Sequence, residues 1–335
     1  MYPNDTFISQ LEIVSYVSSF GYMGVELFFV TSGFVILGSL EHQASFTTFI
    51  NARFKRIYPS LCISVPIMYI VCNLLNQRFI APIPVSSLLP SLTLLGPDFL
   101  NYLFSTNFIW TTGVLWSLFI EIQFYLISGV IFFKLKKFTF LTKLFVFAIS
   151  LQLLKIILSI SNVNAKYALD ALLPINNYIW WFLAGATFWR IMNSQNSKRL
   201  QFLIAVSIFF NLLTLNFKSL EFKFSPVASF IIISIYVLFY CVTKHSIGVR
   251  FLKAKILVWL GGVSYELYLI HESLGISIIS KINQSTMFQI GLPAFIILLV
   301  IVIGIMISLS AILKYFSSLI TKIFSSLKHL YSNKF

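Results

Sequence analysis

Charged side chains are scarce in this chain of 335 residues. Asp, Glu, Lys and Arg together make up 10% of it, whereas hydrophobic residues make up 58%. Soluble domains carry roughly 25% charged residues, so this composition cannot cover a globular surface with polar groups. It excludes a soluble globular protein and predicts an all-α integral membrane protein, for which lipid is the main solvent.

Acidic residues are especially few. The chain has 10 of them against 24 Lys and Arg, which gives a formal net charge of +14. Such an excess can mark a nucleic-acid-binding protein, but here the basic residues lie in short connectors between apolar runs. Basic connectors beside membrane spans are the ordinary topology signal. We therefore expect membrane lipid as a partner and no nucleic acid.

Cysteine is also rare. Cys62, Cys72 and Cys241 all lie inside apolar runs, without CxxC or paired spacing. This pattern is typical of small buried side chains and supports neither a disulfide framework nor a metal site. The N-terminus lacks the basic and apolar regions of a signal peptide and is not expected to be one. Residues 1–19 are predicted to form a short segment, which the charges of the connectors place on the extracytoplasmic side.

Nine apolar runs are long enough to cross a bilayer, which takes ~20 residues in a helix. They lie near 20–40, 57–75, 113–133, 140–160, 170–190, 200–217, 225–243, 256–279 and 288–314. Irregular backbone cannot face lipid, so each run is expected to be a helix. We predict a single membrane domain over residues 1–335, with about nine helices around a polar interior cavity.

The connectors between these runs alternate in charge. The first, third, fifth and seventh are basic, and the even-numbered ones are nearly neutral. The positive-inside rule places the basic connectors and the tail of residues 315–335 in the cytoplasm. The N-terminus would then lie outside a plasma (inner) membrane that the chain crosses several times.

Polar residues recur at helical spacing within three runs. In the 113–133 run they are Ser117, Glu121, Tyr125 and Ser128; in the 256–279 run they are Ser264, Tyr268 and His271; Glu26 adds a third acidic point. Each spacing puts the side chains on one helix face. We expect three helices to turn polar faces toward one interior.

Plainer readings of these residues stay open. Glu121 could be a structural carboxylate bound to neighbouring hydroxyls, His271 a packing residue, and Glu26 a side chain that faces water.

A fourth feature is the predicted cytoplasmic loop at 51–61, where Arg53 and Arg56 could bind phosphate oxygens. Its alternative is plain positive-inside topology with contact to lipid headgroups.

Four segments carry a resemblance to a known family. They are GVELFFVTSGFVI (24–36), ARFKRIYP (52–59), WSLFIEIQFYL (116–126) and SYELYLIHES (264–273). In this order they resemble the signature motifs of the membrane acyltransferase-3 family. Ile122 stands where the family often has a second Glu, and Glu272–Ser273 depart from its usual ending after the histidine.

The resemblance implies transfer of an acyl group, usually acetyl, from cytoplasmic acyl-CoA to a hydroxyl of a cell-surface glycan. Acyl-CoA would be a co-substrate, with no bound cofactor. Arg53 and Arg56 would bind its phosphates, and Glu121 and His271 would be the catalytic candidates. The supporting and acceptor-side candidates are Glu26, Trp116, Ser117, Tyr125 and Tyr268.

One departure from the family concerns the N-terminus. The family begins with a helix that carries an Arg and the His regarded as catalytic, yet no residue before Gly24 is His or Arg. The chain is therefore expected to lack that helix, through a misplaced start or as a truncated, inactive remnant. A transporter or flippase of a lipid-linked sugar is the rival from another functional class.

Overall fold

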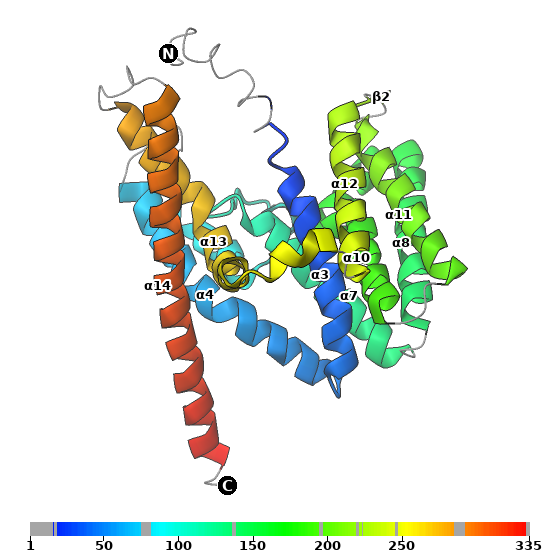
Figure 1. Cartoon of the computed structure of the whole chain (residues 1–335), viewed down its shortest axis with the longest axis horizontal. Coiled ribbons are helices and arrows are strands. Elements are labelled where there is room, and N and C mark those ends of the chain that lie inside the picture. The colour runs from blue at the N-terminus through cyan, green and yellow to red at the C-terminus, as the bar shows by residue number, and fades with distance from the viewer. Residues whose placement is uncertain are drawn as a thin grey trace. The chain divides into compact units, whose positions relative to one another are not determined.

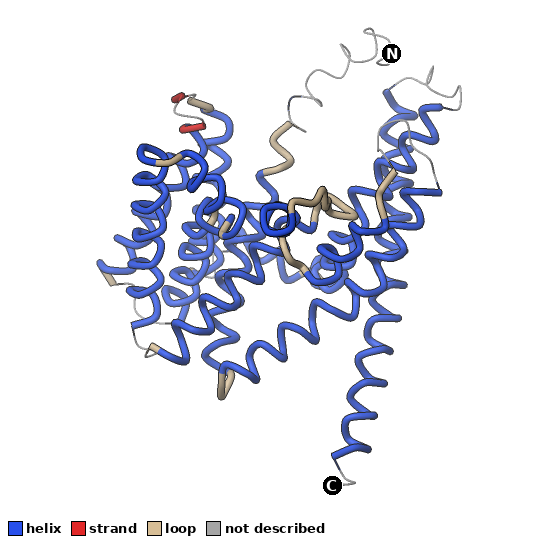
Figure 2. Tube along the Cα trace, turned by 180° about the vertical axis from the view of Figure 1, so that it is seen from behind, coloured by secondary structure: helices blue, strands red, loops and turns tan. Residues whose placement is uncertain are grey.

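The computed structural model describes residues 16, 19–74, 82–135, 139–193, 197–218, 221–222, 224–244, 247–284 and 292–332. Almost all of them are helical, as Figure 2 shows. Within these ranges the only β pairing is a two-residue antiparallel ladder between β1 (Phe217–Lys218) and β2 (Glu221–Phe222). The predicted all-α class is confirmed.

The elements follow one another with short connectors (Figure 1). The α-helices are α3 (Met23–His42), α4 (Phe46–Leu74), α5 (Leu88–Thr93), α6 (Pro97–Phe104), α7 (Leu115–Lys134), α8 (Phe140–Ser161), α9 (Val163–Leu172), α10 (Ile179–Asn193), α11 (Lys198–Asn216), α12 (Pro226–Thr243), α13 (Lys255–Gln284) and α14 (Leu292–Ser332). Three 3₁₀ turns join them: η1 (Val85–Ser87), η3 (Pro174–Asn177) and η4 (Ile247–Lys253).

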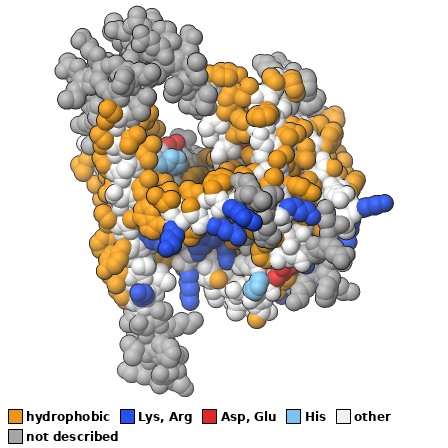
Figure 3. Space-filling model, in the orientation of Figure 1, with side chains coloured by type: hydrophobic (Ala, Val, Ile, Leu, Met, Phe, Trp, Pro, Cys, Tyr) orange, Lys and Arg blue, Asp and Glu red, His pale blue; other side chains and the backbone are white. Residues whose placement is uncertain are grey.

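Seven helices in the described part of the chain are long and apolar enough to cross a membrane. They are α3, α4, α7, α8, α11, α12 and the Ile297–Ile323 part of α14. Large hydrophobic side chains of α8, α11, α12 and α14 are exposed, and hydrophobic side chains cover much of the visible surface in Figure 3. The chain is a multi-pass membrane protein.

The other two predicted spans differ from that pattern. The run at 170–190 is broken by η3, and α10 has only 15 residues, or ~22 Å at 1.5 Å per residue. That is shorter than the ~30 Å hydrocarbon core. The run at 256–279 is the 30-residue helix α13. This helix is long enough to cross a membrane, but it is too polar to be counted with the seven apolar helices.

One predicted boundary is wrong. The basic segment at 51–61 is not a loop, because α4 begins at Phe46 and contains Pro59 and Pro66 in its interior. The predicted tail at 315–335 is helical as far as Ser332, where α14 ends, and its cytoplasmic location stays a prediction. At 41 residues α14 is ~60 Å long, which exceeds the thickness of a bilayer. The predicted segment 1–19 lies almost wholly outside the described residues.

The chain forms two compact units that interleave along the sequence. Unit 1 comprises Met1–Phe49, Gln123–Lys166 and Leu173–Arg250; unit 2 comprises Ile50–Ile122, Tyr167–Leu172 and Phe251–Phe335. The helix α7 therefore contributes its first turns to unit 2 and the rest to unit 1. Whether the whole chain acts as a single domain stays a prediction.

The centre of unit 1 is α10. It contacts α3, α8, α11 and α12, and nearly all its residues are buried. A helix that is apolar all round is expected to be enclosed by others. The Phe182 ring stacks on Phe124 with ring centroids 4.2 Å apart, and Trp180 stacks on Phe210 at the same separation.

The turn before α10 is irregular backbone inside the protein, and its polar groups are hydrogen-bonded. The Gln152 amide donates to the Asn176 carbonyl at 2.9 Å, and the Ile175 N–H donates to the Gln123 side chain at 3.3 Å. Asn176 itself is fully buried. Non-helical backbone at membrane depth is tolerated where protein satisfies it, which explains how Pro174 is accommodated here.

Two glycines set the close approach of α3 to α10. A Cβ on Gly33 would lie 2.1 Å from the Phe182 carbonyl oxygen, and one on Gly185 would lie 1.9 Å from the Val30 carbonyl oxygen. Both obstacles are backbone atoms, which cannot rotate away. The two helices can therefore pack this closely only with glycine at both positions.

Gly33→Ala or Gly185→Ala should force α3 and α10 apart and lower the free energy of unfolding by about 1–3 kcal/mol, as overpacking does. Gly24→Ala is the matched control, because nothing lies within 4 Å of its added Cβ. The measurement is the thermal midpoint of detergent-solubilised protein. Equal midpoints for Gly33→Ala and Gly24→Ala would contradict the close approach.

Candidate functional site

In unit 2, α13 faces α4 with two polar side chains. Ser60 donates a hydrogen bond to Glu266 Oε1 at 2.7 Å, and the Tyr265 hydroxyl donates to the Ile57 carbonyl at 3.1 Å. Glu266 and Ser60 are only 6% and 2% exposed. A buried carboxylate requires such a donor, so this pair fixes α13 against α4.

A second set of contacts joins α13 to the start of α7. The Tyr268 hydroxyl lies 2.5 Å from Ser117 Oγ and donates to the Val114 carbonyl at 3.1 Å. One turn further along α13, Glu272 Oε2 accepts the Val114 N–H at 3.0 Å and the Thr112 hydroxyl at 3.2 Å. We call the side chains Tyr265, Glu266, Tyr268 and Glu272 the α13 polar seam.

The α13 polar seam connects two of the predicted site regions. Glu121, 7% exposed, interacts electrostatically with both Tyr265 and Tyr268. Arg56 also acts on Tyr265. Tyr265 is therefore within electrostatic reach of a guanidinium on α4 and a carboxylate on α7. Arg53 lies one turn before Arg56 on α4 and is half-buried.

His271 lies at the exposed edge of the same helix. Its Nδ1 is 2.8 Å from the Tyr268 carbonyl oxygen, and the two rings are 5.5 Å apart. A carbonyl oxygen can only accept, so in this hydrogen bond Nδ1 carries the proton. The neutral ring then has its lone pair on Nε2, which makes that nitrogen the basic one.

The structure brings together only part of the predicted polar faces. Ser117, Glu121 and Tyr268 meet as expected, but Ser264 is exposed and donates to the Gly261 carbonyl of its own helix. Trp116 lies half-buried in the first turn of α7, still within unit 2.

Glu26 and Tyr125 both lie in unit 1. Glu26 is half-buried in the first turn of α3, where the positive end of the helix dipole favours a carboxylate. It interacts electrostatically with Tyr178 at the start of α10. Tyr125 is 3% exposed and packs edge-on against Phe49. Its surroundings are those of a core residue.

Sequence reasoning missed Glu266 and the role of Glu272. Glu266 lies on a different face of α13 from the Ser264, Tyr268 and His271 stripe, and Glu272 stands out in the sequence only as a departure from the family pattern. The sequence does hold a signal for both residues, since α13 carries two carboxylates within a mainly apolar run.

Within the described residues, no three His, Cys, Asp or Glu side chains gather as a metal site.

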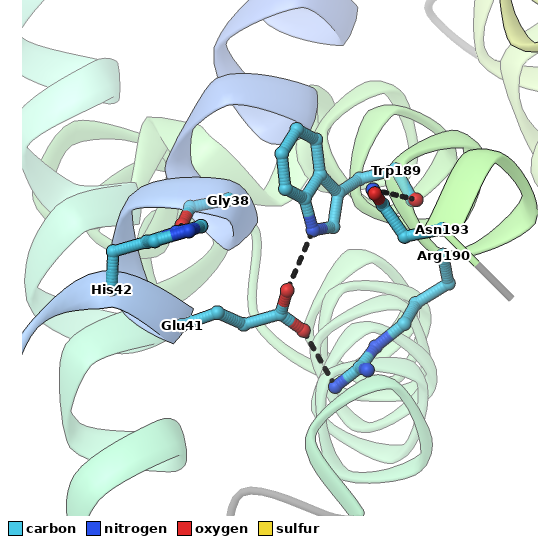
Figure 4. A network of polar contacts seen from close by, with 6 residues as sticks. All are labelled: Gly38, Glu41, His42, Trp189, Arg190 and Asn193. Atoms are coloured by element: carbon cyan, nitrogen blue, oxygen red, sulfur yellow. Dashed lines mark hydrogen bonds and ion pairs between the residues drawn. The ribbon is translucent and has the colours of Figure 1, made fainter.

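A separate polar network ties α3 to α10 in unit 1 (Figure 4). Glu41 accepts from Trp189 Nε1 at 2.8 Å and forms an ion pair with Arg190 at 2.9 Å. Gly38 leaves room for the Trp189 ring, because a Cβ there would lie 2.7 Å from it. His42 Nδ1 lies at hydrogen-bond distance from the Gly38 carbonyl oxygen, 2.7 Å away. The network stabilises the C-terminal ends of both helices.

These features define a class of protein: a multi-pass membrane protein with acid, hydroxyl and imidazole groups on adjoining helices. The acyltransferase-3 family model, described as an acyltransferase domain, matches residues 1–313. The chain belongs to this family of membrane acyltransferases. No curated protein and no solved structure matches it significantly.

Ser60→Ala should leave the Glu266 carboxylate without its hydroxyl donor and lower the free energy of unfolding by about 1–3 kcal/mol. Ser64→Ala is the control, because Ser64 lies one turn along α4 and is equally buried, but its hydroxyl makes no hydrogen bond within the described part of the chain. Detergent-phase thermal unfolding compares the two variants. If Ser64→Ala were as destabilising as Ser60→Ala, the hydrogen bond would not be what holds α13 to α4.

Proposed function

We propose that this protein transfers an acyl group, most simply acetyl, from cytoplasmic acyl-CoA to a hydroxyl of a cell-surface glycan. The observation that carries the proposal is the position of Tyr265, whose hydroxyl donates to the carbonyl of Ile57, the residue after Arg56 on α4. Tyr265 is also within electrostatic reach of Glu121 on α7. A donor-binding region on α4 and a reaction region at the start of α7 would thus both adjoin one helix, α13. Membership of the acyltransferase family supports the reaction class.

The donor region is the basic turn of α4. Arg53 and Arg56 are three residues apart in a helix, so both guanidinium groups lie on the same side of α4. Guanidinium groups bind phosphate oxygens through two parallel hydrogen bonds. In this proposal they hold the phosphates of CoA and direct its thioester along α13 toward Tyr268.

The reaction region supplies a base. As the acceptor hydroxyl attacks the thioester carbonyl carbon, His271 Nε2 takes the hydroxyl proton. The carbon–sulfur bond then breaks, and the CoA thiolate leaves and takes up that proton, so an ester and free CoA thiol result. A positioned imidazole contributes ~10²–10⁴-fold to such a step. Glu121 would stabilise the positive charge that develops on the imidazole.

The remaining roles rest on the resemblance. Ser117 and Tyr268 would hydrogen-bond the reacting groups, and Trp116 stays a predicted contact for the glycan acceptor. The acceptor roles predicted for Glu26 and Tyr125 rest on the resemblance alone, because both residues lie in unit 1 and Tyr125 packs as a core residue.

The orientation in the membrane belongs to the proposal too. In unit 1, the Glu41–Arg190 ion pair links the ends of α3 and α10, and Arg199 contacts Thr142 at the start of α8. These contacts bring the first, third and fifth connectors to one side of unit 1. They support a shared cytoplasmic location for these basic connectors of a plasma-membrane protein. The cytoplasmic location proposed for the C-terminus rests on the positive-inside rule alone.

Arg56→Ala should weaken acyl-CoA binding by about 10–100-fold, since a hydrogen bond to a charged group contributes about 1.5–3 kcal/mol. Lys55→Ala removes the same charge from the neighbouring exposed residue of α4 and is the matched control. Binding is measured on purified protein by titration with a non-hydrolysable acyl-CoA analogue. Equal losses for the two variants would indicate a general charge effect and contradict a phosphate site at Arg56.

His271→Ala should lower kcat for transfer of labelled acetyl into base-labile glycan esters by ~10²–10⁴-fold. Ser264→Ala, two turns earlier on an exposed face of α13, should leave the rate unchanged. An undiminished rate for His271→Ala would remove the imidazole from the chemistry. Glycan movement across proteoliposomes without any release of acyl from acyl-CoA would favour the transporter instead.

A further inference from the structure

The backbone of Val114, just before α7, is bound at both of its polar groups by α13. Glu272 accepts the Val114 N–H, and Tyr268, one turn earlier on α13, donates to the Val114 carbonyl. We infer that Glu272 is a positioning residue that fixes the first turn of α7 and thereby places Ser117 and Glu121 for the acyl transfer. This inference rests on the proposed function.

The Glu272 carboxylate is enclosed by the turn at 112–114. Two donors from this turn, the Val114 N–H and the Thr112 hydroxyl, converge on the same oxygen, Oε2. Between them, a Cβ on Gly113 would lie 2.6 Å from Oε1 and 2.7 Å from Oε2. Glycine at 113 is what lets the chain pass this close to the carboxylate.

The first turn of α7 needs this support because its own hydrogen bonds are long. Leu115 and Trp116 donate to carbonyls three residues earlier at 3.4 Å, and Ser117 does so at 3.3 Å. The first N–H groups of a helix have no partner within it, and a carboxylate there also interacts favourably with the helix dipole. Glu272 supplies both effects from another helix.

The chain just before this turn is already anchored. Thr111 N–H donates to Ser91 Oγ at 2.8 Å, and the Thr111 hydroxyl donates to the Ser87 carbonyl at 3.2 Å. Losing Glu272 therefore releases the Thr112 hydroxyl and the Val114 N–H rather than the whole loop, and leaves the Tyr268 bond to the Val114 carbonyl in place. The displaced residues are those that lead into Ser117.

The consequence for the reaction is specific. Ser117 pairs with the Tyr268 hydroxyl at 2.5 Å, and Glu121 follows one turn later on α7. A shift of this turn changes how both meet Tyr268, whereas Arg53 and Arg56 lie on α4. Glu272 should therefore affect kcat for acyl transfer and leave KM for acyl-CoA nearly unchanged.

The test is a double-mutant cycle of Gly113→Ala and Glu272→Ala in the full-length protein, read out by kcat, by KM and by the thermal midpoint without substrate. Each single variant should lower kcat by ~10–100-fold, the size of loss that a misplaced reacting group causes. In the Glu272→Ala background, Gly113→Ala should have little further effect, because the carboxylate that it meets is gone. Gly275→Ala on α13 is the control, because nothing lies within 4 Å of its added Cβ. It should leave kcat, KM and the thermal midpoint unchanged in the wild type and in each of the other variants.

Glu272→Gln supplies the second arm. One amide oxygen can accept both bonds that converge on Oε2, so this variant should keep kcat within about threefold of the wild type, far from the tenfold change that 1.4 kcal/mol produces. Additive effects of Gly113→Ala and Glu272→Ala would overturn the inference. A Glu272→Ala variant that changes only KM would overturn it as well.

The two proposals fail in different ways. If the wild type releases no acyl group from acyl-CoA, the proposed function falls, and the role of Glu272 in catalysis falls with it. Non-additive thermal midpoints in that case would still establish the contact between Gly113 and Glu272. If the wild type is active but Glu272→Ala keeps its kcat, the positioning role alone is overturned.

Discussion

A carboxylate inside an apolar helix costs several kcal/mol unless hydrogen-bond donors meet it. In unit 2 this requirement fixes where α13 lies, because its two carboxylates obtain their donors from different segments. Glu266 obtains a hydroxyl from Ser60 on α4, and Glu272 obtains an N–H and a hydroxyl from the turn before α7. The α13 polar seam thus holds α4 and α7 together, and with them the basic turn and Glu121.

The same seam explains why the proposed chemistry can be local. Arg56 and Glu121 act on one tyrosine, Tyr265, and Glu121 also acts on Tyr268. His271 lies one turn beyond Tyr268 and contacts its carbonyl. Side chains of α4 and α7, two helices far from α13 in the sequence, therefore act on the same stretch of α13 that carries His271. Unit 1 is held differently, by the glycine contacts of α3 with α10 and by the Glu41 network.

Much of this arrangement could be predicted from the sequence. The positions of the helices follow from the lengths of the apolar runs, and the meeting of Ser117 with Tyr268 follows from polar stripes on two helices. These predictions succeed because each depends on local spacing. The four motifs, in their order along the chain, also indicate the family to which the chain belongs.

Other features could not be predicted, for identifiable physical reasons. The segment around Arg53 is expected to be a loop because its basic residues separate the apolar runs at 20–40 and 57–75, yet α4 begins at Phe46 and continues through it. The Ser60–Glu266 pair joins residues 206 positions apart, and nothing in the local pattern encodes which hydroxyl a buried carboxylate meets. Glu41 has the sequence context of a connector charge, although Trp189 and Arg190 bind it. The short α10 resembles a full span in sequence, because the local pattern does not show that Gln123 and Gln152 of other helices help to satisfy the polar turn before it.

The most direct test of the central claim is photocrosslinking with an acyl-CoA that carries a photoreactive group in its acyl chain, followed by mapping of the labelled peptides by mass spectrometry. The account predicts labelling of the first turns of α7 and of α13 around Tyr268, lost when excess unlabelled acyl-CoA competes. Competable labelling confined to helices such as α8, α11 and α12 of unit 1 would contradict it.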